Sequence, residues 1–290
     1  MNWSVALRLG RVSNLPTVWT NTLAGIVLAG GSVADARTVP LIVALSLFYV
    51  AGMYLNDAYD AEIDARERPE RPIPSGQVSA ETVFTAGFAM MALGLVLLAW
   101  VGYGAAGGTG LGPVMGGLGL GAAIVMYNRR HKDNPLSSVL MGICRVLVYV
   151  TAGLAVAYEL PPALVVGALL LLCYLIGLTY VAKQETLGEI RNLWPLLFLA
   201  APVLYALAIA QGSPNAAMLS LAFVLWVGVA LWFLRRRQPG DVPRAVISLI
   251  AGISLLDAVL IGGTGNLGIA GLAVLGFVLT LALQRFVAGT

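Results

Sequence analysis

The sequence predicts an all-helical membrane protein whose helices cross the bilayer many times. Of the 290 residues, 59% are hydrophobic and only 11% are charged, and the mean hydropathy is +0.88. A soluble domain carries about 25% charged residues, so the charged side chains here are too few to cover a surface that faces water. The composition therefore excludes a soluble enzyme, a disordered chain and a disulfide-stapled secreted domain. The excess apolar surface has to face lipid.

Apolar segments of membrane-spanning length follow one another along the whole chain. A spanning helix needs about 20 mostly apolar residues, and short gaps that hold the basic residues separate the segments of this length. The 34 glycines suit helix–helix contact in a bilayer, because small residues let backbones approach closely. We therefore predict ten spans and no separate soluble domain. In order, the predicted spans are 14–33, 38–56, 81–103, 109–127, 136–157, 162–182, 193–211, 215–234, 243–262 and 266–286.

The basic residues lie almost entirely on one side of this predicted topology. With Arg8 and Arg11 in the cytoplasm, the even-numbered gaps hold most of the other bases, and the odd-numbered gaps hold only Arg37. The positive-inside rule then places both termini in the cytoplasm. It also accounts for the isoelectric point near 9.0 without nucleic-acid binding, for which the sequence has no recognition motif. The bases of the even-numbered gaps are Arg66, Arg68, Arg71, Arg129, Arg130, Lys132, Lys183, Arg191, Arg235, Arg236, Arg237 and Arg244.

Three aspartates after the second predicted span share one face of a helix. Asp57, Asp60 and Asp64 follow one another at i, i+3 and i+7, and a helix turns about 100° per residue. Asn56 lies beside them, whereas Glu62 points to the other side. Three carboxylates on one face repel one another unless a cation lies between them. Ligands that are all oxygen atoms suit Mg²⁺, which bridges to a substrate phosphate. The alternative is a solvated acidic helix end that the arginines of the next gap neutralise.

A second pair of carboxylates follows the sixth predicted span. Glu185 and Glu189 stand at i and i+4, and an alignment shifted by 125 residues places Asp60 on Glu185 and Asp64 on Glu189. Asp57 has no acidic counterpart in this alignment. The match indicates either an internal repeat or a chance agreement. A true repeat would relate residues 1–135 to residues 136–290 and bring the two acidic faces together across a cavity.

The loop after the first acidic cluster reads Arg-Pro-Glu-Arg-Pro-Ile-Pro-Ser-Gly over residues 68–76. Its three prolines and its glycine predict an ordered loop that is not helical. Arg71 lies in the middle of this loop. Arg71 either binds phosphate oxygens through its fork-shaped guanidinium or only supplies a positive charge on a proline-rich turn, as the positive-inside rule requires.

Arg145 and Asp257 are charged residues placed well inside predicted spans. Such a charge costs about 2.5–3.5 kcal/mol on insertion scales and usually faces a cavity or a partner. We therefore expect Arg145 to bind an anionic group of a substrate. The alternative is a structural ion pair between Arg145 and Asp257.

The acidic and proline-rich motifs together resemble a known family. Asn56-Asp57-x-x-Asp60-x-x-x-Asp64 and Arg71-Pro72-Ile73-Pro74-Ser75-Gly76 look like the first signature of the UbiA family of membrane prenyltransferases. Asn14-Leu15-Pro16-Thr17 resembles the segment that opens that family's first helix. The resemblance implies one domain over residues 1–290, built as a bundle of nine to ten transmembrane helices around a central cavity open sideways to lipid. It also implies that Mg²⁺ ionises a prenyl diphosphate and that the prenyl group passes to an aromatic or other small acceptor.

Carried over by position, the resemblance assigns a role to each candidate site residue. The expected metal ligands are Asp57, Asp60, Asp64, Glu185 and Glu189. The expected catalytic residues are Asp57, Asp60, Asp64, Lys183 and Tyr180. The expected substrate-binding residues are Asn14, Asn56, Arg71, Arg145 and Tyr54. Both tyrosines could shield a prenyl cation by cation–π contact, or they could serve in packing alone.

A shorter segment points to one branch of this family. Met141-Gly142-Ile143-Cys144-Arg145, with Ala152-Gly153 beyond, looks like the EboC-type branch, which belongs to bacterial gene sets associated with metabolite export. The expected location is therefore the bacterial inner membrane. The family's second motif is DxxxD, whereas both acids here are glutamates. That difference favours an alternative, an inactive scaffold that binds or helps export an isoprenoid metabolite. A further alternative is a cyclase that ionises a prenyl diphosphate without an acceptor.

Overall fold

The computed structural model describes residues 2–130, 134, 136–187 and 194–287. Over residues 183–187 it describes the backbone alone. The regular structure of these ranges consists of helices. No strand occurs within these ranges. In order, the helices are α1 (Trp3–Leu9), η1 (Val12–Asn14), α2 (Leu15–Leu28), α3 (Thr38–Tyr59), α4 (Ala61–Glu67), α5 (Ala80–Ala99), η2 (Trp100–Gly104), α6 (Gly112–Arg130), α7 (Ser137–Leu154), α8 (Pro162–Leu187), η3 (Trp194–Leu199), α9 (Ala200–Ile209), α10 (Pro214–Arg236), α11 (Asp241–Gly263) and α12 (Leu267–Leu283).

The predicted all-helical membrane fold is confirmed. Every predicted span overlaps a helix or two consecutive helices, with boundaries that differ by a few residues. Within the described ranges, six helices are long and apolar enough to cross a membrane, and two further apolar helices are shorter, Trp194–Ile209 and Leu267–Leu283. The six helices of spanning length are Thr38–Tyr59, Ala80–Gly104, Ser137–Leu154, Pro162–Ala182, Pro214–Arg236 and Asp241–Gly263. The total number of spans stays a prediction.

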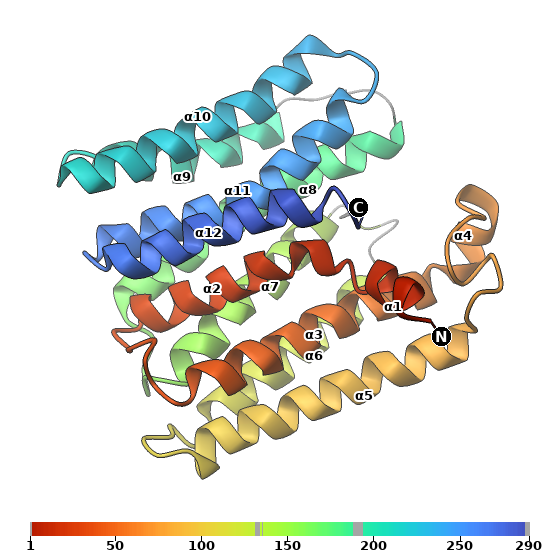
Figure 1. The fold of residues 1–290 in the computed structure, drawn as a ribbon, viewed down its shortest axis with the longest axis horizontal. Coiled ribbons are helices and arrows are strands. Elements are labelled where there is room, and N and C mark those ends of the chain that lie inside the picture. The colour runs from red at the N-terminus through yellow and green to blue at the C-terminus, as the bar shows by residue number, and fades with distance from the viewer. Residues whose placement is uncertain (1, 131–133, 135, 188–193, 288–290) are drawn as a thin grey trace.

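Helix α11 forms the centre of the bundle. Figure 1 shows the long helices lying side by side, and α11 contacts α2, α8, α10 and α12. In α11, 89% of the most apolar window is buried inside the protein, compared with 28% in Ala80–Gly104 and 33% in α10. A helix that is apolar all round belongs in the interior. The peripheral helices keep one apolar face outside.

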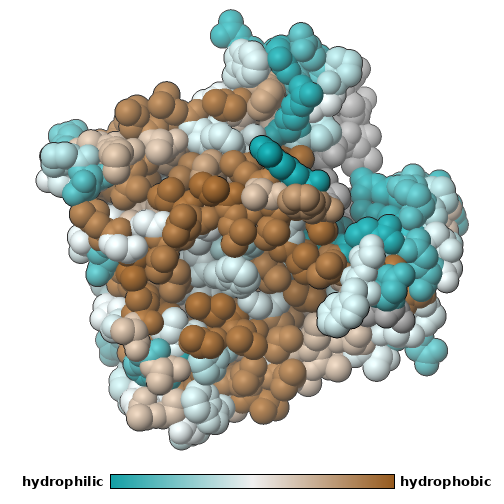
Figure 2. All heavy atoms as spheres, in the orientation of Figure 1, coloured by the Kyte–Doolittle hydropathy of each residue, from teal (hydrophilic) through white to brown (hydrophobic). Residues whose placement is uncertain are grey.

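The outer faces of the bundle are apolar across its middle. Figure 2 shows this hydrophobic surface, with hydrophilic residues gathered mostly at the end that carries α4 and the chain termini. Leu93 and Val96 of α5 and Leu225 of α10 are all more than half exposed. Soluble proteins rarely expose apolar patches of this extent. A bilayer therefore covers this surface, because only there is its exposure favourable.

Close packing between α2 and α7 depends on a glycine. A Cβ atom on Gly25 would lie 2.7 Å from both the Ala152 Cβ atom and the Tyr149 carbonyl oxygen. Only a residue without a side chain permits this distance between the two backbones. The close approach holds Arg145 and Tyr149 of α7 beside the polar residues of α2.

The two ends of the bundle differ in charge, as the sequence predicts. Figure 1 shows both termini and α4 at one end, and Gln284 Nε2 donates to Asn14 Oδ1 at 2.9 Å near that end. Arg37 stands at the start of α3, at the other end of that helix from the acidic cluster. There it donates to the carbonyl oxygens of Gly107 and Ala155 and pairs with Asp35. Which end faces the cytoplasm stays a prediction from the positive-inside rule.

Candidate active site

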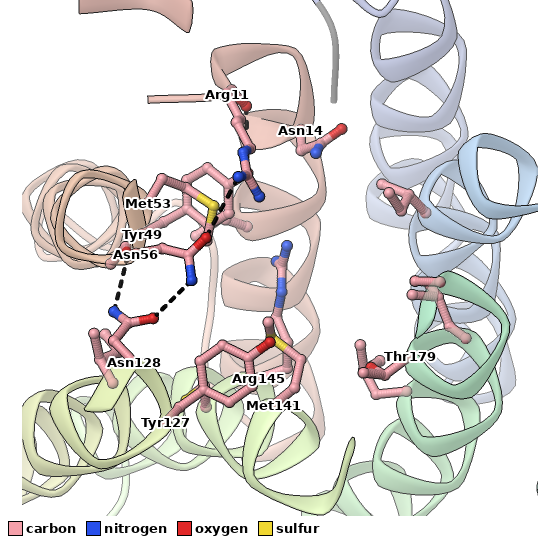
Figure 3. A pocket seen from close by; sticks show the side chains of 18 of the residues that line it. Arg11, Asn14, Tyr49, Met53, Asn56, Tyr127, Asn128, Met141, Arg145 and Thr179 are labelled. Carbon is pink, nitrogen blue, oxygen red and sulfur yellow. Dashed lines mark hydrogen bonds between the residues drawn. The ribbon is translucent and has the colours of Figure 1, made fainter. Parts of the chain in front are cut away.

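A cavity of about 670 Å³ lies among α2, α3, α6, α7, α8 and α11. Figure 3 shows it with side chains from several helices pointing inward. Its walls are mostly apolar, and they include Val18, Leu45, Phe48, Leu120, Ile124, Val148, Leu175, Leu178, Val246, Ile250 and Ile253. Its polar lining includes Arg11, Asn14, Asn56, Asp60, Asp64, Glu67, Arg68, Arg71, Asn128, Arg145 and Thr179. The cavity therefore joins a charged mouth to an apolar interior.

The predicted acidic face forms at this mouth. The backbone N–H of Asp60 donates to Asn56 O at 3.0 Å, and that of Asp64 donates to Asp60 O at 2.8 Å, so helical spacing continues from α3 into α4. Asp57, Asp60 and Asp64 are only 7%, 6% and 2% exposed, whereas Glu62 is exposed. Asp60 and Asp64 line the cavity, but Asp57 does not. Of the three aspartates on the predicted face, two therefore line the cavity.

Two arginines neutralise this acidic face. Arg71 Nη1 lies 2.6 Å from Asp64 Oδ2 and 3.5 Å from Asp57 Oδ1. Arg11 Nη2 approaches Asp57 Oδ1 at 3.2 Å and Asn56 Oδ1 at 3.4 Å. Arg71, one of the arginines of the next gap, thus pairs with this face, but the aspartates are buried and not solvated as the alternative interpretation required. Because both arginines also line the cavity, they reach the same space as the carboxylates.

Arg11 belongs to the site, although the sequence analysis used it only to predict the orientation of the chain in the membrane. It has a left-handed backbone with φ of +41° in the turn between α1 and η1. A residue with a Cβ atom pays about 1 kcal/mol or more for this conformation, which persists only where the surroundings demand it. The turn directs the side chain to Asp57. The nearby Asn14–Thr17 motif was the one signal in the sequence that pointed to this region.

A second residue that the sequence did not reveal is Asn128 of α6. Its Nδ2 donates to Gly52 O at 3.0 Å, and its Oδ1 accepts from Asn56 Nδ2 at 3.2 Å (Figure 3). Asn128 is 5% exposed and lines the cavity. The two contacts fix the carboxamide of Asn56 so that its Oδ1 is directed toward Arg11.

Arg145 points into the cavity from α7 (Figure 3). Its Nη1 donates to Asn21 Oδ1 at 3.1 Å, and its guanidinium lies over the Tyr49 ring, 5.3 Å from the centroid. The alternative of a direct ion pair with Asp257 is not observed. Asn21 lies between the two charges, because its Nδ2 donates to Asp257 Oδ2 at 2.8 Å.

Of the other predicted site residues whose side chains are described, one lines the cavity and two do not. Asn14 lines the cavity and is buried. Tyr54 does not line it: its hydroxyl donates to Ala6 O at 3.3 Å, and its ring belongs to the cluster that α1 forms with α3. The expected substrate contact of Tyr54 is thus replaced by packing, because this side of α3 faces α1. Tyr180 is half-buried and is not among the residues that line the cavity.

The predicted second acidic set cannot be placed. Glu189 and the side chains of Lys183 and Glu185 lie outside the described residues. The prediction that Glu185 and Glu189 face Asp60 and Asp64 therefore remains a prediction. So do the internal repeat and the roles of Lys183 and Tyr180.

The donors at the mouth suit a hard cation. Within the described part of the chain, no three His, Cys, Asp or Glu side chains come together closely enough to hold a metal ion by themselves. Mg²⁺ does not require such a group, since it usually keeps several waters and binds through one or two carboxylates plus substrate phosphates. Asp60, Asp64 and Asn56 offer oxygen donors on one side of the cavity. This donor set fits Mg²⁺ bound together with a phosphate ligand.

Comparison with known proteins gives a family match over most of the chain. The model of the UbiA prenyltransferase family matches residues 18–250. Digeranylgeranylglyceryl phosphate synthase of Ignicoccus hospitalis is 33% identical over 123 residues, which are 42% of this chain and 36% of that protein. The synthase of the same name from Methanopyrus kandleri is 31% identical over 149 residues, 48% of this chain and 49% of that protein. The matches span about a third to a half of these curated relatives.

Solved structures share the fold. The apo structure of a UbiA homologue from Aeropyrum pernix K1 has a TM-score of 0.66 at 17% identity, covering 85% of this chain and 97% of that one. A UbiA homologue from Archaeoglobus fulgidus bound to DMAPP and Mg²⁺ has a TM-score of 0.54 at 15% identity, covering 91% and 99%. At these identities the likeness establishes the arrangement of the helices. The relatives named here are archaeal, so the predicted bacterial origin and inner membrane stay predictions.

Proposed function

Because the chain belongs to the UbiA prenyltransferase family, we propose that it transfers a prenyl group from a prenyl diphosphate to an aromatic or other small acceptor within the membrane. One observation carries this proposal: a single cavity joins a mouth of buried aspartates and arginines to a long apolar interior. A prenyl diphosphate has the same division, with a charged head and an apolar chain. A UbiA homologue of this fold bound to DMAPP and Mg²⁺ supports the match.

The diphosphate end of the substrate is assigned to the mouth. Arg71 and Arg11 line the cavity and carry fork-shaped guanidinium groups, which suit bidentate contact with phosphate oxygens. Asp60 and Asp64, with Asn56, would supply the oxygen ligands for Mg²⁺. Asp57, which was expected to be a further ligand, does not line the cavity and instead pairs with Arg11 and Arg71. When bound there, Mg²⁺ offsets the charge of the diphosphate and assists its departure. Asn128 holds Asn56 in the orientation that presents its oxygen.

The apolar interior is assigned to the prenyl chain and the acceptor. In the reaction, the bond between the prenyl carbon and the diphosphate oxygen breaks, and the diphosphate leaves with the electron pair. The acceptor nucleophile forms a new bond to the allylic carbon and then loses a proton. Walls such as Phe48, Leu120 and Ile253 exclude water, which would otherwise quench the cation. Tyr49 also lines this space, and its ring face can stabilise positive charge.

The test is direct. Purified protein in lipid nanodiscs is incubated with Mg²⁺ and labelled prenyl diphosphates of several chain lengths, and diphosphate release is measured. Release that depends on both Mg²⁺ and an added acceptor supports the proposal. Release with a cyclic hydrocarbon product and no acceptor would indicate the cyclase alternative. Tight binding without any release would indicate a scaffold that binds or moves an isoprenoid metabolite.

The orientation in the membrane follows from charge. We assign the end that carries α4 and both termini to the cytoplasm, because it bears most of the arginines. A water-soluble prenyl diphosphate would then enter at the charged mouth. Labelling of single introduced cysteines from either side of sealed vesicles would test this assignment.

A further inference from the structure

A buried chain of polar side chains links α11 to the cavity through α2. Asn21 Nδ2 donates to both carboxylate oxygens of Asp257, at 2.8 and 3.1 Å, and the Tyr149 hydroxyl donates to Asp257 Oδ1. Asn21 Oδ1 accepts from Arg145 Nη1 at 3.1 Å. Asn21, Tyr149 and Asp257 are each 0% exposed. Substrate in the cavity cannot touch these three residues, but Arg145 lines it.

The orientation of Asn21 follows from its two partners. A carboxylate only accepts hydrogen bonds, and a guanidinium only donates them. The amide of Asn21 must therefore present its nitrogen to Asp257 and its oxygen to Arg145. With Tyr149 as a further donor to Asp257, the carboxylate holds the amide in one orientation. Asp257 thus determines, through Asn21, where the Arg145 guanidinium lies.

This arrangement leaves most of the guanidinium available. Arg145 has five N–H donors, and across the described residues its one hydrogen bond is the bond to Asn21. Tyr49 covers part of its face. A direct ion pair with Asp257 would have occupied the N–H donors of the Arg145 guanidinium. The Asn21 amide between the two residues instead keeps the negative charge of Asp257 near Arg145 and leaves most of these donors uncovered. A cation held inside a membrane with free donors facing a cavity calls for an anionic ligand.

We propose that Asn21 and Asp257 are positioning residues that aim Arg145 at an oxyanion of the acceptor, so that the deep part of the cavity selects acceptors carrying a carboxylate or a phosphate. The inference rests on the proposed function, which supplies an acceptor. The inference also gives a physical reason why the cavity would select an anionic acceptor. With no anion on its exposed donors, Arg145 would repel the allylic cation that forms in the same cavity, and a bound oxyanion reduces that repulsion.

The selection is measured with three small probes of similar shape: benzoate, phenyl phosphate and the neutral benzamide. Their binding to the full chain in nanodiscs is followed by titration calorimetry. In the wild type we expect benzoate or phenyl phosphate to bind at least about tenfold more tightly than benzamide, since a charged hydrogen bond is worth about that factor. The stronger of the two anions identifies the acceptor group as a carboxylate or a phosphate.

Two variants test the positioning role, and one serves as a control. Asn21→Ala and Asp257→Asn should each reduce the preference for the anion over benzamide by about tenfold. Thr22→Ala removes a hydrogen bond inside α2, from the Thr22 hydroxyl to Val18 O at 2.8 Å, and should leave the preference unchanged. Thermal unfolding of each variant is recorded. If one variant does not fold, the other carries the test.

Two results would overturn the inference. One is equal binding of benzoate, phenyl phosphate and benzamide by the wild type. The other is an unchanged anion preference in the folded variants. Both readouts are binding measurements, so they are separate from the proposed function. Anion preference without Mg²⁺-dependent diphosphate release would contradict transfer alone, and release without anion preference would contradict the positioning role alone.

Discussion

Arg71 Nη1 lies 2.6 Å from Asp64 Oδ2, which makes a cation of the proline-rich loop the direct partner of the last aspartate in the acidic cluster. The loop keeps this position through its own backbone. Gly76 has φ of +75°, a conformation that glycine adopts without strain, and Gln77 N donates to Pro72 O at 3.0 Å to close the turn. The loop therefore brings Arg71 to the mouth as a fixed element, and a bound diphosphate would share this guanidinium with Asp64.

Replacing Arg71 should impair the handling of the diphosphate. We expect Arg71→Ala to lower kcat/KM for the prenyl diphosphate by about 10²-fold or more, the usual effect of removing a donor aimed at developing charge. Arg71→Lys should restore part of the loss, because a lysine keeps the charge without the fork. Arg66→Ala is the matched control, since Arg66 is exposed on α4. A loss of equal size in the control would refute a specific role for Arg71.

Asp60 provides the most direct test of the metal site. It is 6% exposed and lines the cavity. Asp60→Ala should abolish Mg²⁺-dependent binding of prenyl diphosphate in a folded protein, because a carboxylate ligand is lost. Glu62→Gln removes an exposed acid of the same segment and should bind as the wild type does. Calorimetric titration with and without Mg²⁺ measures both. Unchanged binding by folded Asp60→Ala would exclude this residue as a ligand.

Asn128 should matter through Asn56 rather than through the substrate chain. Asn128→Ala removes the acceptor that orients the Asn56 amide, so we expect about a tenfold rise in the Mg²⁺ concentration needed for half-maximal activity. Ser46→Ala, on the same helix α3 as Asn56, removes a contact with Trp19 away from the cavity and should leave this concentration unchanged. If Asn128→Ala alters only the thermal stability, its role is confined to packing.

The pH dependence of stability should carry a contribution from Asp35. Hydrogen bonds from Arg37 lower the pKa of the Asp35 carboxyl from its ordinary 3.8 to about 2. A lowered pKa stabilises the fold above the ordinary value, and this contribution is lost as the pH falls from about 4 to about 2. We expect Asp35→Asn to lower the unfolding temperature by the same amount at all pH values above about 5, and by less at pH 3.

Thermal unfolding in detergent between pH 7 and pH 3 measures this difference. Glu62→Gln serves as the control, because this exposed acid has no ion pair among the described residues. A gap between the wild type and Asp35→Asn that stays constant down to pH 3 would contradict the lowered pKa.

The sequence alone was sufficient for the helices and for the acidic face. Apolar segments of about 20 residues predict spanning helices, since every backbone polar group in a bilayer must be satisfied within its own helix. The spacing of Asp57, Asp60 and Asp64 then places them together, because a helix has a fixed number of residues per turn. These features depend on neighbours in the sequence, and the structure reproduces them.

The partners that lie far away in the sequence came only from the tertiary structure. Arg11 reaches Asp57 across 46 positions of the chain, Asn128 reaches Asn56 across 72, and Asn21 reaches Asp257 across 236. Tyr54 shows the reverse case, a residue one turn from the cluster that packs against α1 instead. Such contacts depend on how each helix is rotated about its axis and on which helices are adjacent. Apolar segments of similar composition leave both undetermined, because lipid and neighbouring helices are nearly equivalent surroundings for an apolar side chain.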